Sequence, residues 1–294
     1  MYSQYWQVGL DIQMEAIRAL AAVKRRYGWQ LRYWWHQSLP SGALREGILH
    51  QPDIVSEQLK LLRKQLPLNI SLRIALPAQR ILQRTIPTPD KRLREPERGD
   101  FINAAASKAF PVSSQALSLD HRTATASDSE IIITAARQTE VHQWQECLSQ
   151  AGLPSHVIDI TPCALRYMAT AAGLSGAYWL VHRLENEWLW VSSSDLPFDY
   201  GVIVPDAESD GLQGLPAGRN DLLSLWLAQL HTRIPEERDT PLRVYYSSSC
   251  NESLPENMIE WSPFAAFVQY QPPLPALPAA FTLAGGLALR PADY

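Results

Sequence analysis

A run of strands followed by a helix occurs twice along this chain, and this repeated order restricts the possible folds more than any other feature. In the first half, apolar and aromatic-rich segments predict strands over residues 5–12, 15–23 and 29–37, and apolar residues at helical spacing predict a helix over residues 53–66. In the second half, the same patterns predict strands over residues 178–182, 187–191 and 198–204, and an amphipathic helix over residues 219–233. No short period is visible, so the sequence predicts an internally duplicated α/β fold rather than an array of short repeats.

From residue 90 onward, the sequence predicts a small α+β subdomain inserted between the two halves. Two short strands, at residues 72–76 and 80–86, end at Pro87 and Pro89, and a charge-dense connection over residues 90–98 follows them. Beyond it we expect, in chain order, a helix over residues 98–109, strands over residues 115–121 and 130–136, a helix over residues 139–151 with Thr139 as its N-cap, a strand over residues 155–160, and a helix from Thr161-Pro162 to residue 172.

With 294 residues the chain is long enough for two domains, each with its own core. The predicted elements divide it into a first subdomain of residues 1–89 completed by residues 160–174, an inserted subdomain of residues 90–159, and a second domain of residues 175–294. Residues 262–289 contain no charged side chain, but five prolines interrupt this stretch and argue against a membrane span. We expect a loop and a final short helix there.

Several classes of function lack support in the sequence. None of the seven histidines occurs in an HxH, HExxH or Cys/His spacing, and the three cysteines lie far apart, so no metal site is predicted. The GxSxG, Walker and GxGxxG motifs are absent, so no catalytic residues are predicted. The first residues lack the basic-then-apolar order of a signal peptide, and scattered free thiols suit a reducing compartment. We therefore expect a cytoplasmic protein.

The net charge of −4 conceals an uneven distribution of charge. Residues 1–98 carry 16 Lys and Arg against 8 Asp and Glu, whereas residues 99–294 carry 10 against 22. The basic first third suits an anionic surface such as the inner leaflet or an acidic peptide, or it is an ordinary solvated face. No basic stripe interleaved with aromatic residues is present, and the overall charge is acidic, so direct nucleic-acid binding is not expected.

Short motifs follow one another in a fixed order through nearly the whole chain. They are Val8-Gly9-Leu10-Asp11-Ile12, residues 39–43 with Glu46-Gly47-Ile48, Ala75-Leu76-Pro77, Ala109-Phe110-Pro111 with Leu119-Asp120, Ala151-Gly152-Leu153 with Ile158-Asp159, residues 162–166, and residues 286–290. This order resembles the PilM family of type IV pilus assembly proteins. The resemblance implies an α/β fold of the actin-like, duplicated ribonuclease H-like type. Trp34-Trp35, residues 187–190 and residues 271–275 resemble in particular the HofM-type subgroup, which is associated with the use of DNA as a nutrient.

The resemblance also implies a nucleotide cleft, but the sequence departs from the family at this cleft. Gln13 stands where the family has a glycine, whose missing side chain lets backbone amides approach a phosphate, and Glu15 adds negative charge nearby. Residues 180–185 lack the DxG that begins the second phosphate loop. The implied cofactor-binding residues are Gly9, Asp11, Gln13, Gly285 and Gly286.

We therefore predict a degenerate cleft and no required cofactor. The alternatives are binding of ATP with magnesium by an active actin-like ATPase of pilus assembly or type II secretion, and a sugar-kinase-type enzyme on the same fold, because a fold alone does not define a function. A purely structural interpretation also stays open, in which Asp11 caps a turn and the two adjacent glycines, Gly285 and Gly286, pack a helix.

By the same resemblance, the partner is the cytoplasmic N-terminal tail of a PilN-like or HofN-like bitopic inner-membrane protein, bound in a groove between subdomains. The chain would then be a scaffold of a pilus-like or DNA-uptake machine, peripheral to the inner membrane. Aromatic residues and arginine are enriched at binding hot spots, and the candidate partner-binding residues are Arg32, Trp34, Trp35, Trp188 and Trp190. Aromatic core packing is the alternative for these tryptophans. Residues 271–278 form either a polyproline II arm or a stiff connecting loop.

Overall fold

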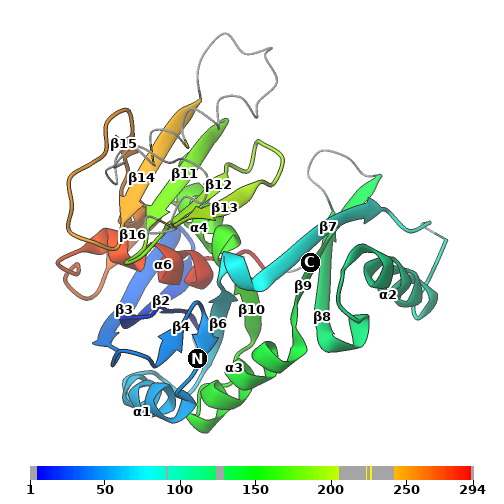
Figure 1. The fold of residues 1–294 in the computed structure, drawn as a ribbon. Coiled ribbons are helices and arrows are strands. Elements are labelled where there is room, and N and C mark those ends of the chain that lie inside the picture. Colours follow the sequence, from blue (N-terminus) through cyan, green and yellow to red (C-terminus); the bar gives the residue numbers. More distant parts are fainter. Residues whose placement is uncertain are drawn as a thin grey trace, which may run out of the picture.

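The two halves of the chain form two sheets that lie on opposite sides of a pair of helices, and a small three-stranded subdomain projects from one side (Figure 1). The computed structural model describes residues 5–90, 92–123, 129–204, 223, 226 and 242–292. The helix predicted over residues 219–233 lies outside these residues, apart from Leu223 and Trp226.

The first sheet has six strands in the order β10-β6-β1-β2-β3-β16. Its antiparallel meander consists of the three predicted strands, β1 (Trp6–Ile12), β2 (Ala16–Arg25) and β3 (Gly28–Ser38). Three further strands join it in parallel: β6 (Ile70–Leu76) beside β1, β10 (Val157–Ile160) beside β6, and β16 (Phe267–Tyr270) beside β3. A short hairpin of β4 (Leu44–Arg45) and β5 (Ile48–Leu49) follows the meander.

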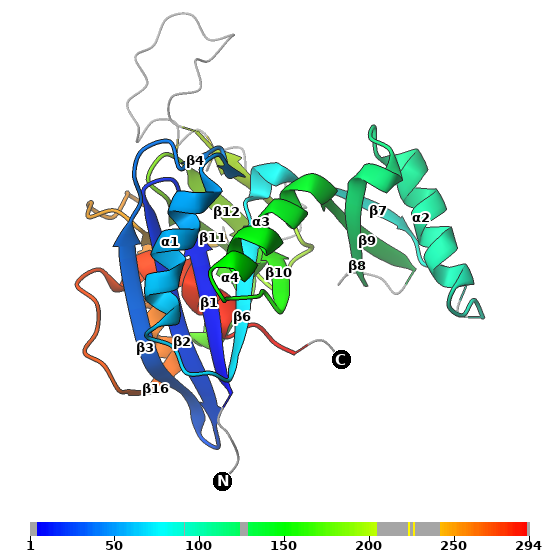
Figure 2. The same ribbon diagram turned by 90° about the horizontal axis from the view of Figure 1, so that it is seen from below.

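One face of the first sheet is covered by α1 (Pro52–Arg63) and α3 (Gln138–Gln150), which pack side by side (Figure 2). Proline at the first turn suits the start of α1, because the missing amide is one that the helix leaves unbonded. Its buried side chains include Leu59 and Leu62, at the spacing that predicted the helix. The predicted N-cap of α3, Thr139, is wrong: the helix begins at Gln138 directly after β9 and has no side-chain cap.

The other face of the first sheet packs on α4 (Thr161–Ala171) and α6 (Thr282–Ala288). One continuous apolar core joins Leu20 of the first sheet, Ala164 and Leu287 of these helices, and Leu180 of the second sheet. The two helices are therefore the shared layer of both halves, and their positions fix how the halves meet.

The second sheet repeats the arrangement of the first. Its order is β13-β12-β11-β14-β15, with the strands β11 (Tyr178–Arg183), β12 (Trp188–Ser192), β13 (Tyr200–Ile203), β14 (Arg243–Ser248) and β15 (Ile259–Glu260). An antiparallel meander of β11, β12 and β13 is again followed by strands added in parallel beside its first strand. The internal duplication predicted from the repeated strand-helix order is thus present, although β14 and β15 were not predicted.

The small subdomain has a sheet of order β7-β9-β8, formed by β7 (Ile81–Pro87), β8 (Leu117–Thr123) and β9 (Glu130–Arg137). It is completed by α2 (Glu97–Ala109) and the short helix η2 (Ser114–Ala116), and its own core contains Ile102, Phe110 and Ile133. The boundaries drawn from the sequence differ from this arrangement. β7, placed in the first subdomain, pairs with β9, because the turn η1 (Ala78–Arg80) after Pro77 leads the chain out of the first sheet. Helix α3 and β10, placed in the insertion, pack on the first sheet.

The last part of the chain returns from the second half to the first. After η3 (Pro263–Ala266), β16 pairs with β3, and η4 (Pro278–Phe281) leads into α6 against β1 and β2. The predicted final short helix is present, although the segment before it also contains β16. Across the described ranges, no helix combines the length and apolar character that crossing a bilayer requires.

Candidate functional site

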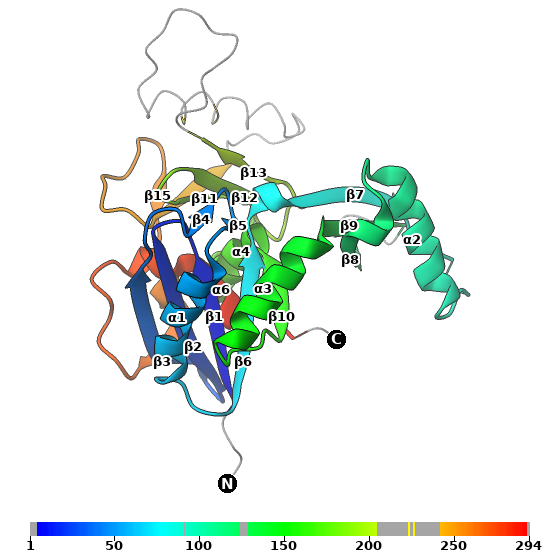
Figure 3. The same ribbon diagram turned by 60° about the horizontal axis from the view of Figure 1, so that its bottom comes forward.

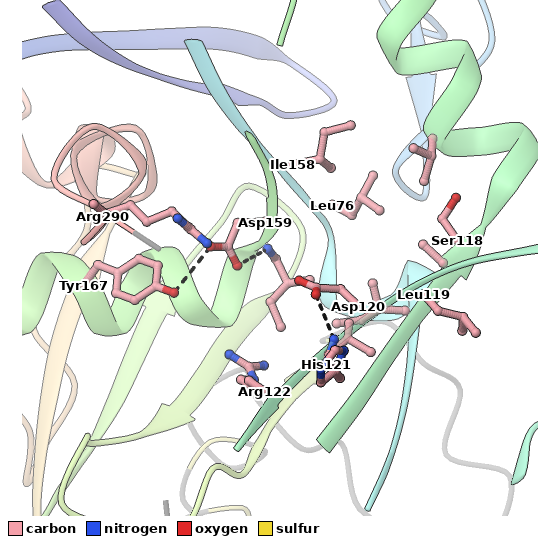
Figure 4. A pocket seen from close by; sticks show the side chains of 16 residues that line it. Leu76, Ser118, Leu119, Asp120, His121, Arg122, Ile158, Asp159, Tyr167 and Arg290 are labelled. Carbon is pink, nitrogen blue, oxygen red and sulfur yellow. Dashed lines mark hydrogen bonds and ion pairs between the residues drawn. The ribbon is translucent and has the colours of Figure 1, made fainter. Parts of the chain in front are cut away.

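A groove of about 710 Å³ separates the body of the molecule from the small subdomain. On the body side it is lined by Ile158, Asp159 and Ile160 of β10 and by Tyr167 of α4, and on the other side by residues 118–122 of β8 (Figure 4). Both β10 and β8 are terminal strands of their sheets. Each therefore has one edge whose backbone amides and carbonyls are not used by a strand of the described chain, which is the arrangement that accepts an added extended segment.

Asp159 organises the inner wall of the groove. Its Oδ2 accepts hydrogen bonds from Arg290 Nε at 2.5 Å and from the Tyr167 hydroxyl at 3.3 Å, and its Oδ1 accepts one from the Ile160 amide at 2.8 Å. The Arg290 carbonyl accepts a bond of 2.8 Å from Arg73 of β6, which also fixes the C-terminal end of α6. Burial, with the nearby Cys163 and Asp159, raises the pKa of Tyr167. The tyrosine therefore remains a neutral donor to the carboxylate.

Arg122 attaches the small subdomain to the body. From β8 its guanidinium lies 2.7 Å from Cys163 Sγ of α4 and 4.3 Å from the centre of the Phe198 ring, on which Arg166 also lies at 4.9 Å. Burial raises the pKa of the Cys163 thiol to about 11. This cysteine is therefore a protonated packing group rather than a nucleophile. At the rim of the groove, Asp120 and His121 of β8 are exposed.

A second, smaller hollow lies where two hairpin turns face each other across the two halves of the chain. The β1–β2 turn contributes Gln13 and the β11–β12 turn contributes Glu185, and the cavity that they line has a volume of about 50 Å³. Arg18 of β2 donates to Glu185 at 2.8 Å, and the two side chains are 7% and 12% exposed. Gln79 also donates to Glu187 across the same gap. Two side-chain contacts, from β2 and from the segment after Pro77, therefore connect the first half of the chain to the β11–β12 turn.

Asp11 precedes the lining residues Ile12 and Gln13 in the chain, lies beside Arg18 in the β1–β2 register, and is 4% exposed. Gln13 Nε2 donates to its Oδ1 at 2.6 Å, while its Oδ2 has no hydrogen-bond partner among the described residues. Burial raises the pKa of Asp11 from 3.8 to about 6, although Arg18 and Gln13 act in the opposite direction. No group of three or more His, Cys, Asp and Glu side chains suited to a metal occurs in the described part of the chain.

A family model described as type IV pilus assembly protein PilM matches residues 9–175, which is more than half of the chain. The chain belongs to the PilM family.

Within this family, one characterised relative is the DNA utilization protein HofM of Escherichia coli strain K12. It is 26% identical over 193 residues, which cover 65% of this chain and 73% of HofM. The sequence-based resemblance to the PilM family and to HofM is thus confirmed, with HofM as a distant homologue.

Two solved structures have a fold similar to that of this chain. The PilM–PilN type IV pilus biogenesis complex matches with a TM-score of 0.75 and 20% identity, covering 98% of this chain and 99% of that chain. The cytoplasmic domain of EpsL, an inner membrane component of the type II secretion system of Vibrio cholerae, matches with a TM-score of 0.56 and 14% identity, covering 99% and 97%. The predicted actin-like α/β fold is therefore confirmed.

The glycines that the PilM resemblance placed at a nucleotide lie in helix packing. A β-carbon at Gly9 would lie 1.9 Å from the Ala284 carbonyl oxygen of α6, and one at Gly286 would lie 1.8 Å from the Ala164 carbonyl oxygen of α4. One at Gly285 would lie 2.8 Å from the Met168 side chain. These three positions let β1, α6 and α4 approach closely, which is the structural role left open for Gly285 and Gly286. Of the other two residues, Gln13 lines the hollow, whereas Asp11 is buried outside its lining and accepts a hydrogen bond from Gln13.

The five aromatic and arginine positions expected at a partner interface do not come together. Trp188 and Trp190 of β12 are buried in the core of the second sheet, so these two are not an exposed binding face. Trp34 donates to the Pro273 carbonyl oxygen at 2.7 Å and packs edge-on against Phe281, so residues 271–277 run as a loop over β3 and Pro278 begins η4. Trp35 packs on the face of the first sheet that is opposite to the face on which Trp34 lies.

Two pairs of site residues were missed as sites by sequence reasoning. Asp159 and Arg290 were noted only as family landmarks, and their pairing across 131 positions gives those landmarks a shared physical role. Arg18 and Glu185 carried no motif at all. A buried charge in an otherwise apolar strand, as at Arg18, was the one available signal, since such a charge needs a partner.

Proposed function

We propose that this PilM-family chain is a cytoplasmic scaffold of a type IV pilus-like or DNA-uptake machine, and that the groove between β10 and β8 binds the cytoplasmic N-terminal tail of a PilN-like or HofN-like inner-membrane protein. The observation that carries the proposal is the groove itself, which has a volume of about 710 Å³ and is bordered by two terminal strands. One of the similar solved structures is a PilM–PilN complex.

The chemistry of the groove suits an extended peptide. Backbone groups at the edges of β10 and β8 supply hydrogen bonds that do not depend on sequence, while side-chain pockets supply specificity. Leu76, Leu119 and Ile158 offer apolar contacts, and Asp120 and His121 offer polar ones at the rim. Because the Asp159–Arg290 pair is already satisfied internally, it holds the wall in place rather than offering a free charge.

The same proposal holds that the hollow between the hairpin turns is a degenerate nucleotide cleft. The residues present do not fit a triphosphate with its metal, since a cavity of about 50 Å³ is close to the share of liquid volume of one or two water molecules. Arg18 is engaged with Glu185, and both Glu185 and Glu187 line the hollow with acidic groups where an anion would lie. An actin-like ATPase or a sugar-kinase-type enzyme remains the rival function.

Calorimetry with a synthetic peptide of the neighbouring membrane protein's cytoplasmic tail tests the scaffold function. We expect saturable binding that Leu119→Asp, within the groove, weakens by at least about tenfold, because a desolvated carboxylate costs more than 1.4 kcal/mol. Leu274→Asp is the matched control, because this exposed leucine lies on the loop over β3. Thermal unfolding of both variants verifies that they fold. Absence of binding by the wild type, or equal weakening by the two variants, contradicts the groove assignment.

Calorimetry with ATP and magnesium tests the second part. We expect no binding in the micromolar range and no release of phosphate. Micromolar binding with turnover would replace the scaffold function by the ATPase.

A further inference from the structure

One end of the first sheet gathers basic and aromatic side chains from four separate segments. The β2–β3 hairpin turns there at Arg26 and Tyr27, and the first residues of β1 lie alongside, as Figures 2 and 3 show. The Trp6 amide donates to the Asn69 carbonyl oxygen, which places the α1–β6 connection next to β1. On the other side Val268 of β16 contacts Gly28. We call this surface the hairpin end and define it by Tyr5, Lys24, Arg26, Tyr27 and Leu68.

The apolar side chains of the hairpin end are unusually exposed. Leu68 is 88% exposed, Tyr27 79% and Tyr5 57%, and they come from three different segments. Single exposed apolar residues are normal on a protein surface, but several at one end indicate a contact site. Tyrosine in particular suits a boundary between water and an apolar phase, because its ring is apolar and its hydroxyl is polar.

The cations at and near this end lie over aromatic rings. Lys24 Nζ lies 4.7 Å from the centre of the Trp29 ring, Arg26 lies 5.4 Å from that of Tyr27, and Arg32 lies 5.2 Å from that of Trp6. Within the described ranges, neither Lys24 nor Arg26 forms an ion pair. Both are exposed, so their charge is available to an external anion.

No acidic side chain of the converging segments opposes this charge. Residues 5–10, 16–45, 58–72 and 262–271, which contain the four segments, have no aspartate and no glutamate. They contain the cations named above together with Arg63 and Lys64 at the end of α1. The hairpin end is therefore locally basic, although the chain as a whole is acidic.

We propose that the hairpin end docks on an anionic lipid surface, with the cations against lipid phosphates and Tyr27, Tyr5 and Leu68 at the level of the headgroups. An acidic protein would use the charge but would not require three exposed apolar side chains around a hairpin tip, whereas a membrane interface accommodates both. This contact is separate from the groove and adds to the proposed function an orientation of the scaffold on the membrane.

Vesicle co-sedimentation of the full chain tests the proposal. We expect binding to vesicles that contain phosphatidylglycerol and little binding to pure phosphatidylcholine. The double variant Lys24→Ala/Arg26→Ala should weaken the partition coefficient about 30-fold, since each cation near an anionic surface contributes about fivefold. Raising the salt to about 1 M should release most of the protein, because the screening length falls to about 3 Å.

The matched control is Arg94→Ala/Arg98→Ala, which removes the same charge from exposed positions of the small subdomain. This control variant should bind vesicles within about twofold of the wild type. Tyr27→Ser, in contrast, should weaken binding to vesicles at every salt concentration, because the lost contact is apolar.

Three outcomes would each overturn the proposal. They are equal binding to neutral and anionic vesicles, equal effects of the two double variants, and binding to polyglutamate without binding to vesicles. Lys24→Ala/Arg26→Ala should bind the tail peptide normally, and Leu119→Asp should bind vesicles normally, so the two proposals fail independently.

Discussion

Arg18 and Glu185 lie 167 positions apart in the sequence, and their side chains meet at 2.8 Å between the turns of two equivalent hairpins. Arg18 lies in β2 of the β1–β2 hairpin and Glu185 in the turn of the β11–β12 hairpin, so the pair joins the first hairpin of one half to the first hairpin of the other. Both side chains are largely removed from water. The junction between the halves is therefore held by a charged contact as well as by the apolar helices α4 and α6.

Removing one partner of this pair should destabilise the protein strongly. Arg18→Ala leaves the Glu185 carboxylate buried without its partner, and we expect the free energy of unfolding to fall by about 3–5 kcal/mol in urea titrations. The exposed pair Lys60–Glu57 of α1 is the control, and Lys60→Ala should cost less than about 1 kcal/mol. A loss of similar size in both variants would mean that the pair between the halves is not structurally important.

Asp11→Asn should stabilise the protein at neutral pH. The pKa of the folded Asp11 is raised from 3.8 to about 6 by burial, so the folded chain retains a proton that the unfolded chain has already lost. The contribution of this group to stability is therefore greatest at low pH and disappears as the pH rises through that window, at about 1.4 kcal/mol per unit of pKa difference. Asparagine removes the charge and can still accept the Gln13 hydrogen bond.

The measurement is urea unfolding of wild type and variant over a series of pH values. The gain in stability should be roughly 2–3 kcal/mol near pH 7 and close to zero near pH 4. Asp195→Asn, at an exposed position, should show no such dependence. A constant difference between wild type and Asp11→Asn at all pH values would contradict the raised pKa.

His182 should have the opposite effect on acid stability. It is fully buried between Ser247 and Ser249, and burial lowers its pKa from 6.5 to about 3. In this case the unfolded chain gains the proton first as the pH falls, so stability decreases between pH 6.5 and about 3. His182→Gln should be less stable at neutral pH, by about 1–3 kcal/mol for an imperfectly bonded buried polar group, but should lose less stability on acidification.

Acid titration followed by tryptophan fluorescence measures this slope. His142→Gln, at an exposed position of α3, should retain the slope of the wild type. An unchanged slope in His182→Gln would show that another group governs unfolding in this pH range.

Gly9→Ala should destabilise the junction of β1 and α6. The added methyl group would lie 1.9 Å from the Ala284 carbonyl oxygen and 2.6 Å from the Ala288 amide nitrogen, and neither backbone atom can move without displacing the helix. We expect a loss of about 1–3 kcal/mol or more in thermal or urea unfolding. Gly99→Ala in α2 is the control and should be neutral or slightly stabilising, since its one close neighbour is the flexible end of Glu95. Equal stability of Gly9→Ala and the wild type would remove the packing explanation.

Local patterns predicted the elements well where one pattern extended over a whole element. The β1–β2–β3 meander was found because its strands are apolar and end at clear turns, and α1 was found from Leu59 and Leu62 at helical spacing. The assignment of β7 to the wrong sheet shows the limit of this method, because the residues of a strand do not indicate its neighbour. Strands β14 and β15 were missed for lack of a strong alternation.

The site was harder to predict than the fold, for the same reason. Gly9 was identified by position but assigned to a phosphate, since a glycine that admits a helix backbone and a glycine that admits an anion look alike in sequence. The pairing of Asp159 with Arg290 depends on how α6 meets β6 and β10, which only the assembled fold defines.

The return of α6 to the first sheet has a consequence for biosynthesis. Leu20, Ala22 and Leu31 of the first meander share their core with residues 283–289, so a nascent chain keeps this apolar face open until those residues leave the ribosome. The N-terminal half is therefore synthesised first but completed last. A premature stop before residue 282 would remove part of its interior rather than shorten a free end.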